Sequence, residues 1–101
     1  MNVGSLYAVK EYHWLLFPTK ETAATATRGW PRAAAADDAY AAGYWGRRFN
    51  CEVPYFSPES FIVFLEEDGK YKKVLTSDGR IGWTWFEERF NDCFEEMKVA
   101  V

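Results

Sequence analysis

The chain has 101 residues, of which 49% are hydrophobic and 19% aromatic, and its formal net charge is −3 at pH 7. This length fits one domain, and so apolar a composition excludes an intrinsically disordered chain. The acidic balance argues against a nucleic-acid-binding protein, because such proteins usually carry a basic patch or a high isoelectric point. We therefore expect a single folded domain over residues 1–101.

The two cysteines and the apolar runs indicate where the protein resides. Cys51 and Cys93 are too few for a disulfide framework, and the N-terminus lacks the basic and apolar regions of a signal peptide. The longest apolar run, Phe61–Leu65, has five residues, far fewer than a membrane span needs. We expect a cytoplasmic protein with reduced thiols and no membrane association.

The first predicted element is a strand over Leu6–Phe17. Apolar side chains occupy both parities of this segment. Because successive strand residues point to opposite faces, the pattern predicts one long strand that is covered on both sides. Pro18 ends this strand, since proline has no N–H to donate to a ladder.

An alanine-rich segment follows, over residues 19–50. Pro31 suits the first turn of a helix, alanine has the highest helix propensity, and Gly43 suits the position after a helix end. These residues predict a helix over 31–42.

Two alternatives stay open beside this helix. Thr22–Thr27 forms either a short helix or a loop, and Tyr44–Phe49 either extends the helix or turns back toward the sheet.

Three consecutive antiparallel strands are predicted between residues 59 and 84. The continuous apolar run Phe61–Leu65 predicts a buried strand, and Lys70–Thr76 and Arg80–Thr84 predict the next two. Asp78-Gly79 predicts the tight turn between them, because glycine readily adopts positive φ. Gly82 indicates a bend or the close approach of another backbone.

A helix is predicted after residue 84. Thr84 and Glu87 match a capping box. The following apolar residues recur at helical spacing on one face: Phe86, Phe90, Cys93, Phe94 and Met97. We expect this amphipathic C-terminal helix to pack on the core with an acidic face in solvent; the alternative is an exposed apolar stripe that binds a partner.

The stretch Lys70–Trp83 resembles the signature of bacterial SH3-like domains. It has Tyr71 before Val74, a turn with Gly79, and the apolar–Gly–Trp strand Ile81-Gly82-Trp83. The resemblance implies an α+β, mainly β fold: a small SH3-like antiparallel barrel with the 19–50 segment inserted after the first strand and the amphipathic helix at the C-terminus. The acidic-aromatic groove motif of polyproline-binding SH3 domains is missing, so that activity is not implied.

The whole chain is also similar to short uncharacterised proteins of cyanobacteria and their phages. This similarity implies an accessory protein of a phage or a cyanobacterium, and it implies no particular activity.

Nothing in the sequence indicates an enzyme. His13, Cys51 and Cys93 supply fewer than the four ligands of a structural zinc site. There is no glycine-rich phosphate loop or nucleophile elbow. We expect no catalysis, no cofactor and no metal.

The favoured function is protein binding, as a small adaptor-type domain. Trp, Tyr and Arg dominate the energetics of protein interfaces, and loops on a rigid scaffold usually carry binding residues. The candidate anchors are Trp30, Tyr44, Trp45, Arg47 and Arg48.

Two other binding functions stay open. Cations beside aromatic rings suit single-stranded nucleic acid, and the candidates are Lys70, Lys72, Lys73 and Arg80 with Tyr71 and Trp83. Alternatively, acids on one helix face could imitate a phosphate backbone and inhibit a nucleic-acid enzyme; these are Glu87, Glu88, Asp92, Glu95 and Glu96.

Overall fold

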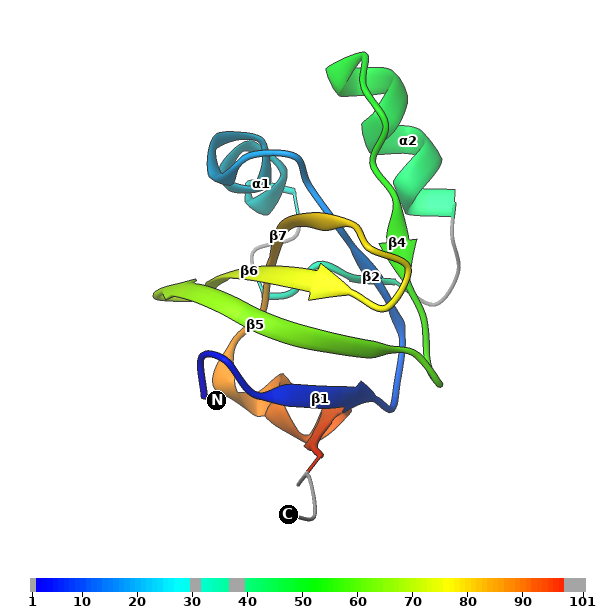
Figure 1. The fold of residues 1–101 in the computed structure, drawn as a ribbon. Helices are drawn as coiled ribbons and strands as arrows, with labels where there is room; N and C mark the ends of the chain where they lie inside the picture. The colour runs from blue at the N-terminus through cyan, green and yellow to red at the C-terminus, as the bar shows by residue number, and fades with distance from the viewer. Residues whose placement is uncertain (1, 30–31, 37–39, 98–101) are drawn as a thin grey trace.

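The computed structural model describes residues 2–29, 32–36 and 40–97, which form two antiparallel sheets and three helices (Figure 1). One sheet has the order β7-β6-β5-β1-β8, and the other has the order β3-β2-β4. The strands are β1 (Leu6–Val9), β2 (His13–Leu15), β3 (Ala35–Ala36), β4 (Tyr55–Phe56), β5 (Phe61–Asp68), β6 (Tyr71–Thr76), β7 (Ile81–Trp85) and β8 (Phe94–Glu96). The helices are α1 (Lys20–Thr27), α2 (Tyr40–Phe49) and the 3-10 helix η1 (Glu88–Cys93).

The three predicted strands between 59 and 84 are confirmed as β5, β6 and β7. Their second turn is at Asp78-Gly79, where Gly79 has φ +87°. The Gly79 N–H donates to the carbonyl of Thr76 at 3.0 Å, and the Thr76 N–H donates to the carbonyl of Arg80 at 2.8 Å. The turn residues thus fix the register of the hairpin through local bonds.

The expected closed SH3-like barrel is wrong, although an α+β fold made mainly of strands is right. The described strands form two open sheets. These sheets are joined by two isolated bridges, Phe17 with Trp83 and Ala33 with Phe86. Two bridges leave strand edges unpaired, so the chain does not form a continuous ladder.

The single strand expected over Leu6–Phe17 is also wrong. The segment divides into β1 and β2, which belong to different sheets. Tyr12 between them has φ +68°, and the Trp14 indole N–H donates to the carbonyl of Glu11 at 2.7 Å. Both parities are apolar because Trp14 and Leu16 enter one apolar cluster of the interior, whereas Leu15 and Phe17, on the other side of the chain, enter a second one.

The 31–42 helix is wrong as well. Ala35–Ala36 forms β3, which pairs with β2, and of the described residues in the predicted range only 40–42 lie in helix α2. The Ala34 N–H donates to the carbonyl of Trp85 at 2.8 Å. Small alanine side chains let this backbone approach two neighbouring strands, and these long-range bonds override helix propensity. Pro31 and residues 37–39 of the predicted helix lie outside the described residues.

Both segments of residues 19–50 whose structure the sequence left open are helical. Thr22–Thr27 lies within α1, whose Thr19 and Thr22 form a capping box. Tyr44–Phe49 lies within α2, and Gly43, expected to follow a helix end, is inside that helix.

The expected C-terminal helix is not an α-helix. Thr84 lies in β7 with its hydroxyl buried, and the chain continues through η1 into β8, which pairs with β1. The Phe86 N–H donates to the carbonyl of Lys70 at 3.0 Å. Phe86 is therefore bonded to a distant segment, as in a sheet, and not to the preceding turn of a helix. The predicted apolar residues still turn inward in part: Phe86, Cys93 and Phe94 are buried, whereas Met97 is exposed.

Two apolar clusters fill the interior. The Trp14 core contains aromatic and aliphatic side chains of the five-stranded sheet, β2 and β4: Tyr7, Val9, Trp14, Leu16, Phe56, Ile62, Phe64, Val74, Phe86, Cys93 and Phe94 with Ala33. The Trp85 core surrounds three large rings with small residues: Leu15, Phe17, Ala23, Ala26, Ala34, Ala41, Ala42, Trp45, Val53 and Trp85.

Gly82 joins the two cores by close backbone contact. A Cβ at this position would lie 2.6 Å from Leu16 Cγ and 2.8 Å from the carbonyl oxygen of Phe17. The predicted close approach of another backbone at Gly82 is confirmed.

Candidate protein-binding surface

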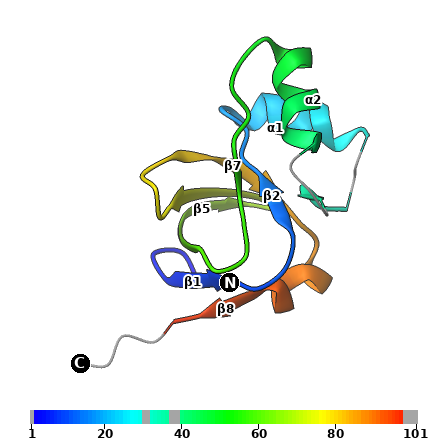
Figure 2. The same cartoon turned by 90° about the vertical axis from the view of Figure 1, so that its right-hand side faces the viewer.

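Helix α2 presents one face to solvent and buries the other. Tyr40, Tyr44, Arg47 and Arg48 are exposed and follow the spacing i, i+4, i+7 and i+8, so they share one side of the helix. We name these four residues the α2 face. In Figures 1 and 2, α2 lies at the opposite end of the molecule from β1 and β8.

The buried side of α2 anchors the helix. Ala41, Ala42 and Trp45 are buried there. The Trp45 ring stacks on Phe49 at 5.5 Å between centroids and meets the edge of Phe17 at 6.3 Å. Because the anchoring residues belong to the Trp85 core, the α2 face is held by a packed interior.

The predicted anchors therefore divide between the two sides of the helix. Tyr44, Arg47 and Arg48 lie on the α2 face, whereas Trp45 is only 6% exposed and packs in the core. Trp30 lies outside the described residues. Tyr40, 73% exposed, was missed because the expected helix ended at residue 42; the Tyr-Tyr-Arg-Arg spacing would have revealed it.

The charge of the α2 face is positive. Helix α2 contains Arg47 and Arg48 in its last turn and no acidic residue. Neither arginine forms an ion pair with any residue that the structure describes. Two cations on a chain of net charge −3 thus remain available to an external anion.

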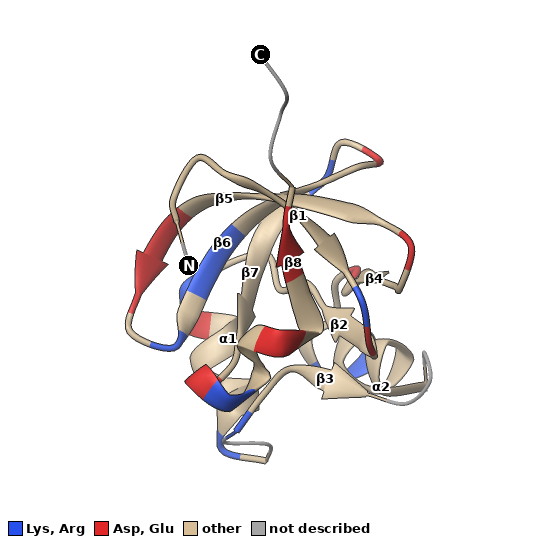
Figure 3. Cartoon of the chain, turned by 90° about the horizontal axis from the view of Figure 1, so that it is seen from below, with Lys and Arg blue, Asp and Glu red and all other residues tan. Residues whose placement is uncertain are grey.

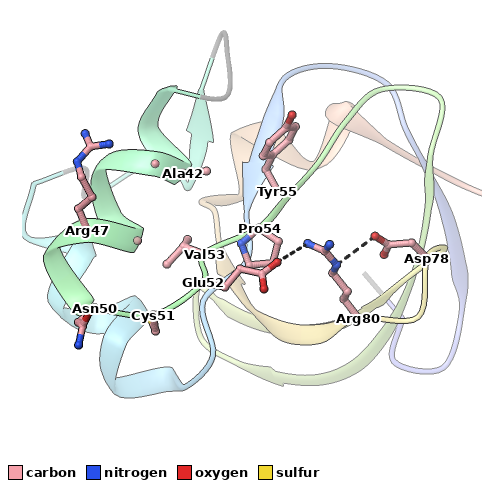
Figure 4. A pocket seen from close by; sticks show the side chains of 12 residues that line it. Ala42, Arg47, Asn50, Cys51, Glu52, Val53, Pro54, Tyr55, Asp78 and Arg80 are labelled. Carbon is pink, nitrogen blue, oxygen red and sulfur yellow. Dashed lines mark ion pairs between the residues drawn. The ribbon is translucent and has the colours of Figure 1, made fainter.

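A groove of about 970 Å³ runs beside the C-terminal half of α2 (Figure 4). Gly43, Gly46 and Arg47 line its helix side, and Tyr55 and Arg80 line the other. A Cβ at Gly46 would lie 3.1 Å from the carbonyl oxygen of Cys51, so glycine lets the following loop approach the helix.

The charges in the groove differ in how they are held. The Arg80 guanidinium pairs with Glu52 at 3.2 Å and with Asp78 at 3.3 Å, and the Arg47 side chain points away from that pair (Figure 4). Arg80 is therefore neutralised within the chain, which leaves Arg47 as the free cation of the groove lining in the described structure.

The lysines proposed to bind nucleic acid do not share a surface. Lys72 is 7% exposed; its ammonium donates to the carbonyl of Gly69, lies 3.6 Å from Glu67 and stands 5.3 Å from the Phe86 ring centroid. Lys73 has the opposite parity and is opposite Trp83 on β7. A continuous cationic track over β6 is therefore not formed.

The acids of the proposed inhibitor are not arranged as the sequence suggested. Glu88 and Asp92 lie on η1, and Glu95 and Glu96 lie on β8 (Figure 3). Glu95 is paired with Lys10 at 3.1 Å. The acids thus occupy two kinds of element, and no single helix face carries them.

The thiols do not form a reactive centre. Cys51 is exposed and Cys93 is buried, which confirms the expected burial of Cys93. Burial, and then the Glu11 carboxylate 3.7 Å away, raise the pKa of the Cys93 thiol to about 11. In the described part of the chain, no group of three or more His, Cys, Asp or Glu residues is placed to hold a metal ion.

Comparison with protein-family models, curated proteins and solved structures finds no match for this chain. Among the residues that the structure describes, no helix has the length and apolar character that crossing a membrane requires.

Proposed function

We propose that the protein is a non-enzymatic binding module that recognises another protein through the α2 face. One observation carries the proposal: two tyrosines and two arginines, the latter without an ion pair among the described residues, share the exposed side of a helix whose other side is fixed in the core. Tyr and Arg are enriched at interface hot spots because they combine a large contact area with polar groups.

The charge of the α2 face selects the partner's chemistry. Arg47 and Arg48 form no ion pair with the residues that the structure describes, so an acidic partner surface would gain two charge-assisted contacts without breaking a described pair. Charge complementarity of this kind speeds association and excludes basic partners. We therefore propose a partner with an acidic and partly apolar surface.

The anchoring of α2 reduces the cost of binding. Trp45 and Phe49 hold the backbone of the helix through ring contacts in the Trp85 core. Binding then has to order only the exposed side chains, which leaves more of the contact energy as affinity.

The test is a capture experiment with charge-reversed variants. Wild-type protein and the Arg47→Glu/Arg48→Glu variant are immobilised, and proteins bound from the native cell extract are quantified by mass spectrometry. A specific partner should bind the variant at least about thirtyfold more weakly, as expected for a loss of about 2 kcal/mol or more at a hot spot.

The control is Arg28→Glu/Arg89→Glu, which changes the net charge by the same amount as the test variant. Its two sites lie away from the α2 face, at the end of α1 and in η1. Equal loss of binding in both variants would show that only net charge matters, and would contradict the proposal. Tight binding to DNA or RNA that falls steeply between about 50 and 200 mM salt would favour a nucleic-acid binder instead.

A further inference from the structure

Strand β4 is the last strand on one side of the β3-β2-β4 sheet, and the bonds of β2 show which groups lie on its outer edge. The Leu15 N–H donates to the carbonyl of Ala34 at 2.9 Å, on the β3 side. The Leu16 N–H donates to the carbonyl of Pro54 at 2.9 Å, on the β4 side. Successive residues of a strand direct their main-chain groups to alternate edges. Tyr55, which is opposite Leu15, therefore turns its N–H and carbonyl away from β2.

The main-chain groups of Tyr55 are open in the described structure. No backbone group within residues 2–29, 32–36 and 40–97 bonds to its N–H or carbonyl. Unpaired groups of this kind on a sheet edge are a template for a further strand. Tyr55 also lines the groove of about 970 Å³ beside α2, so the open edge lies where the surface is hollowed (Figure 4).

The facing wall of the groove leaves room for another chain. Gly43 and Gly46 of α2 line it, so the helix backbone itself forms much of this wall. The groove is closed at Val53, which is 5% exposed and whose nitrogen would lie 3.8 Å from a Gly46 Cβ. It is open at Tyr55, which is 44% exposed. A hollow that runs along the unpaired edge of a strand suits a peptide in extended conformation.

The charges of the lining are divided between the two walls. Arg47, on the helix wall, forms no ion pair with the residues that the structure describes. On the other wall, Glu52 and Asp78 share the single guanidinium of Arg80, so the acids outnumber the cation there. An acidic side chain in the groove is therefore attracted to the helix wall and repelled by the other.

We propose that the groove binds an extended segment of the protein partner, which pairs as a strand with the Tyr55 edge of β4 and places an acidic side chain at Arg47. This proposal rests on the proposed function and specifies the shape of the bound segment. A helix uses its main-chain groups internally and cannot satisfy those of Tyr55, whereas a strand can. Main-chain bonds supply affinity in this mode, and the contact with Arg47 supplies specificity.

The experiment selects linear peptides from a random library displayed on phage, with the wild-type chain immobilised. The selected peptides should carry an acidic residue and should lack proline at their centre, because a pairing strand needs its N–H groups. A bound peptide should slow the alkylation of Cys51, which is exposed and lines the groove. It should also slow the solvent exchange of the Tyr55 amide proton, measured by NMR.

Two pairs of variants separate the charge from the strand edge. Arg47→Glu should raise the peptide dissociation constant at least about tenfold, as expected for the loss of a charge-assisted contact. Arg28→Glu makes the same charge change at the exposed end of α1 and should leave the constant unchanged. Tyr55→Pro removes the N–H at the open edge, whereas Tyr55→Ala removes only the side chain. The proline variant should therefore bind at least about tenfold more weakly than the alanine variant.

Circular dichroism checks that Tyr55→Pro is folded; if it is not, protection of the Tyr55 amide in the wild type decides. A library without binders, or peptides that protect neither Cys51 nor that amide, would overturn the groove. Peptides that bind Tyr55→Pro and Tyr55→Ala equally would overturn strand pairing. A protein captured from the extract through Arg47 and Arg48 that leaves the Tyr55 amide unprotected would support the α2 face and contradict the groove alone.

Discussion

The Trp14 core and the Trp85 core are built from opposite kinds of side chain. In the Trp14 core, rings meet rings: Trp14 lies 4.9 Å from Phe94 and 5.5 Å from Phe86, between centroids. In the Trp85 core, five alanines surround the rings and let α1, α2 and the Ala34 segment approach closely. The Trp14 core is filled by large side chains, whereas the Trp85 core needs small ones. Truncation should therefore destabilise the Trp14 core most, and enlargement of an alanine should destabilise the Trp85 core.

The largest effect is expected from Trp14→Ala. Trp14 is fully buried and contacts rings of three other segments, so its removal leaves a cavity that the sheets cannot fill. The free energy of unfolding should fall by about 3–5 kcal/mol, measured by urea denaturation. Tyr40→Ala, at a 73% exposed site, is the control; equal losses would contradict the assignment of Trp14 to the core.

Trp45→Ala should have a smaller global effect and a large local one. Its ring fixes α2 to Phe17 and Phe49. The loss should lie near the lower end of about 3–5 kcal/mol, because the five-stranded sheet keeps all its own contacts. Hydrogen exchange should accelerate in α2 much more than in β5 and β6. Uniform acceleration would show that the two cores do not separate.

Ala26→Leu tests the dependence of the Trp85 core on small side chains. Ala26 is fully buried, whereas Ala24 on the same helix is exposed. Enlarging Ala26 should lower the free energy of unfolding by about 1–3 kcal/mol. Ala24→Leu keeps the helix propensity and should change the stability by under about 0.5 kcal/mol. A neutral Ala26→Leu would mean that the Trp85 core holds spare volume.

The smallest effect concerns the Cys93 thiol in the Trp14 core. Its folded pKa of about 11 lies above the ordinary value of 9.0. The folded state therefore retains the proton longer, so its contribution to stability is complete below pH 9 and declines as the pH rises toward 11. Denaturation curves should show this decline, and Cys93→Ala should remove it. At neutral pH, alkylation should modify Cys51 well before Cys93.

The sequence predicts an element well where its signal is local. Asp78-Gly79 specifies a tight turn by backbone conformation alone, and Gly79 has the positive φ that the turn requires. The flanking strands then pair with their nearest neighbours along the chain. Such elements need no knowledge of the rest of the fold.

The wrong predictions lie where distant segments decide the backbone. Thr84 and Glu87 match a helix cap, but Phe86 and Glu87 bond instead to Lys70 and Arg32, and β8 pairs with β1. Helical spacing identified Phe86, Cys93 and Phe94 correctly as buried, because short irregular elements also alternate between interior and solvent, but it was wrong for Met97. Spacing could not show that a strand bond competes with the helix.

Of the candidate site, the sequence predicted the residue types but not which of them face solvent. Residue type pointed to Tyr44, Arg47 and Arg48, and the exposed side of α2 contains all three. Residue type could not separate Trp45 from them, because Trp serves equally as a core residue and as an anchor. The packing of Ala41, Ala42 and Trp45 in the interior decides which side of α2 faces solvent, and only the structure shows that packing.

The pairing of β1 with β8 has a consequence for biosynthesis. Tyr7 is opposite Glu96 and Val9 is opposite Phe94. During synthesis β1 therefore cannot pair with β8 until almost ninety further residues have been added. Contacts of such long sequence separation form slowly, and during translation the unpaired edge of β1 stays open to other chains. Because Phe94 belongs to the Trp14 core, that core can be completed only after Phe94 has left the ribosome.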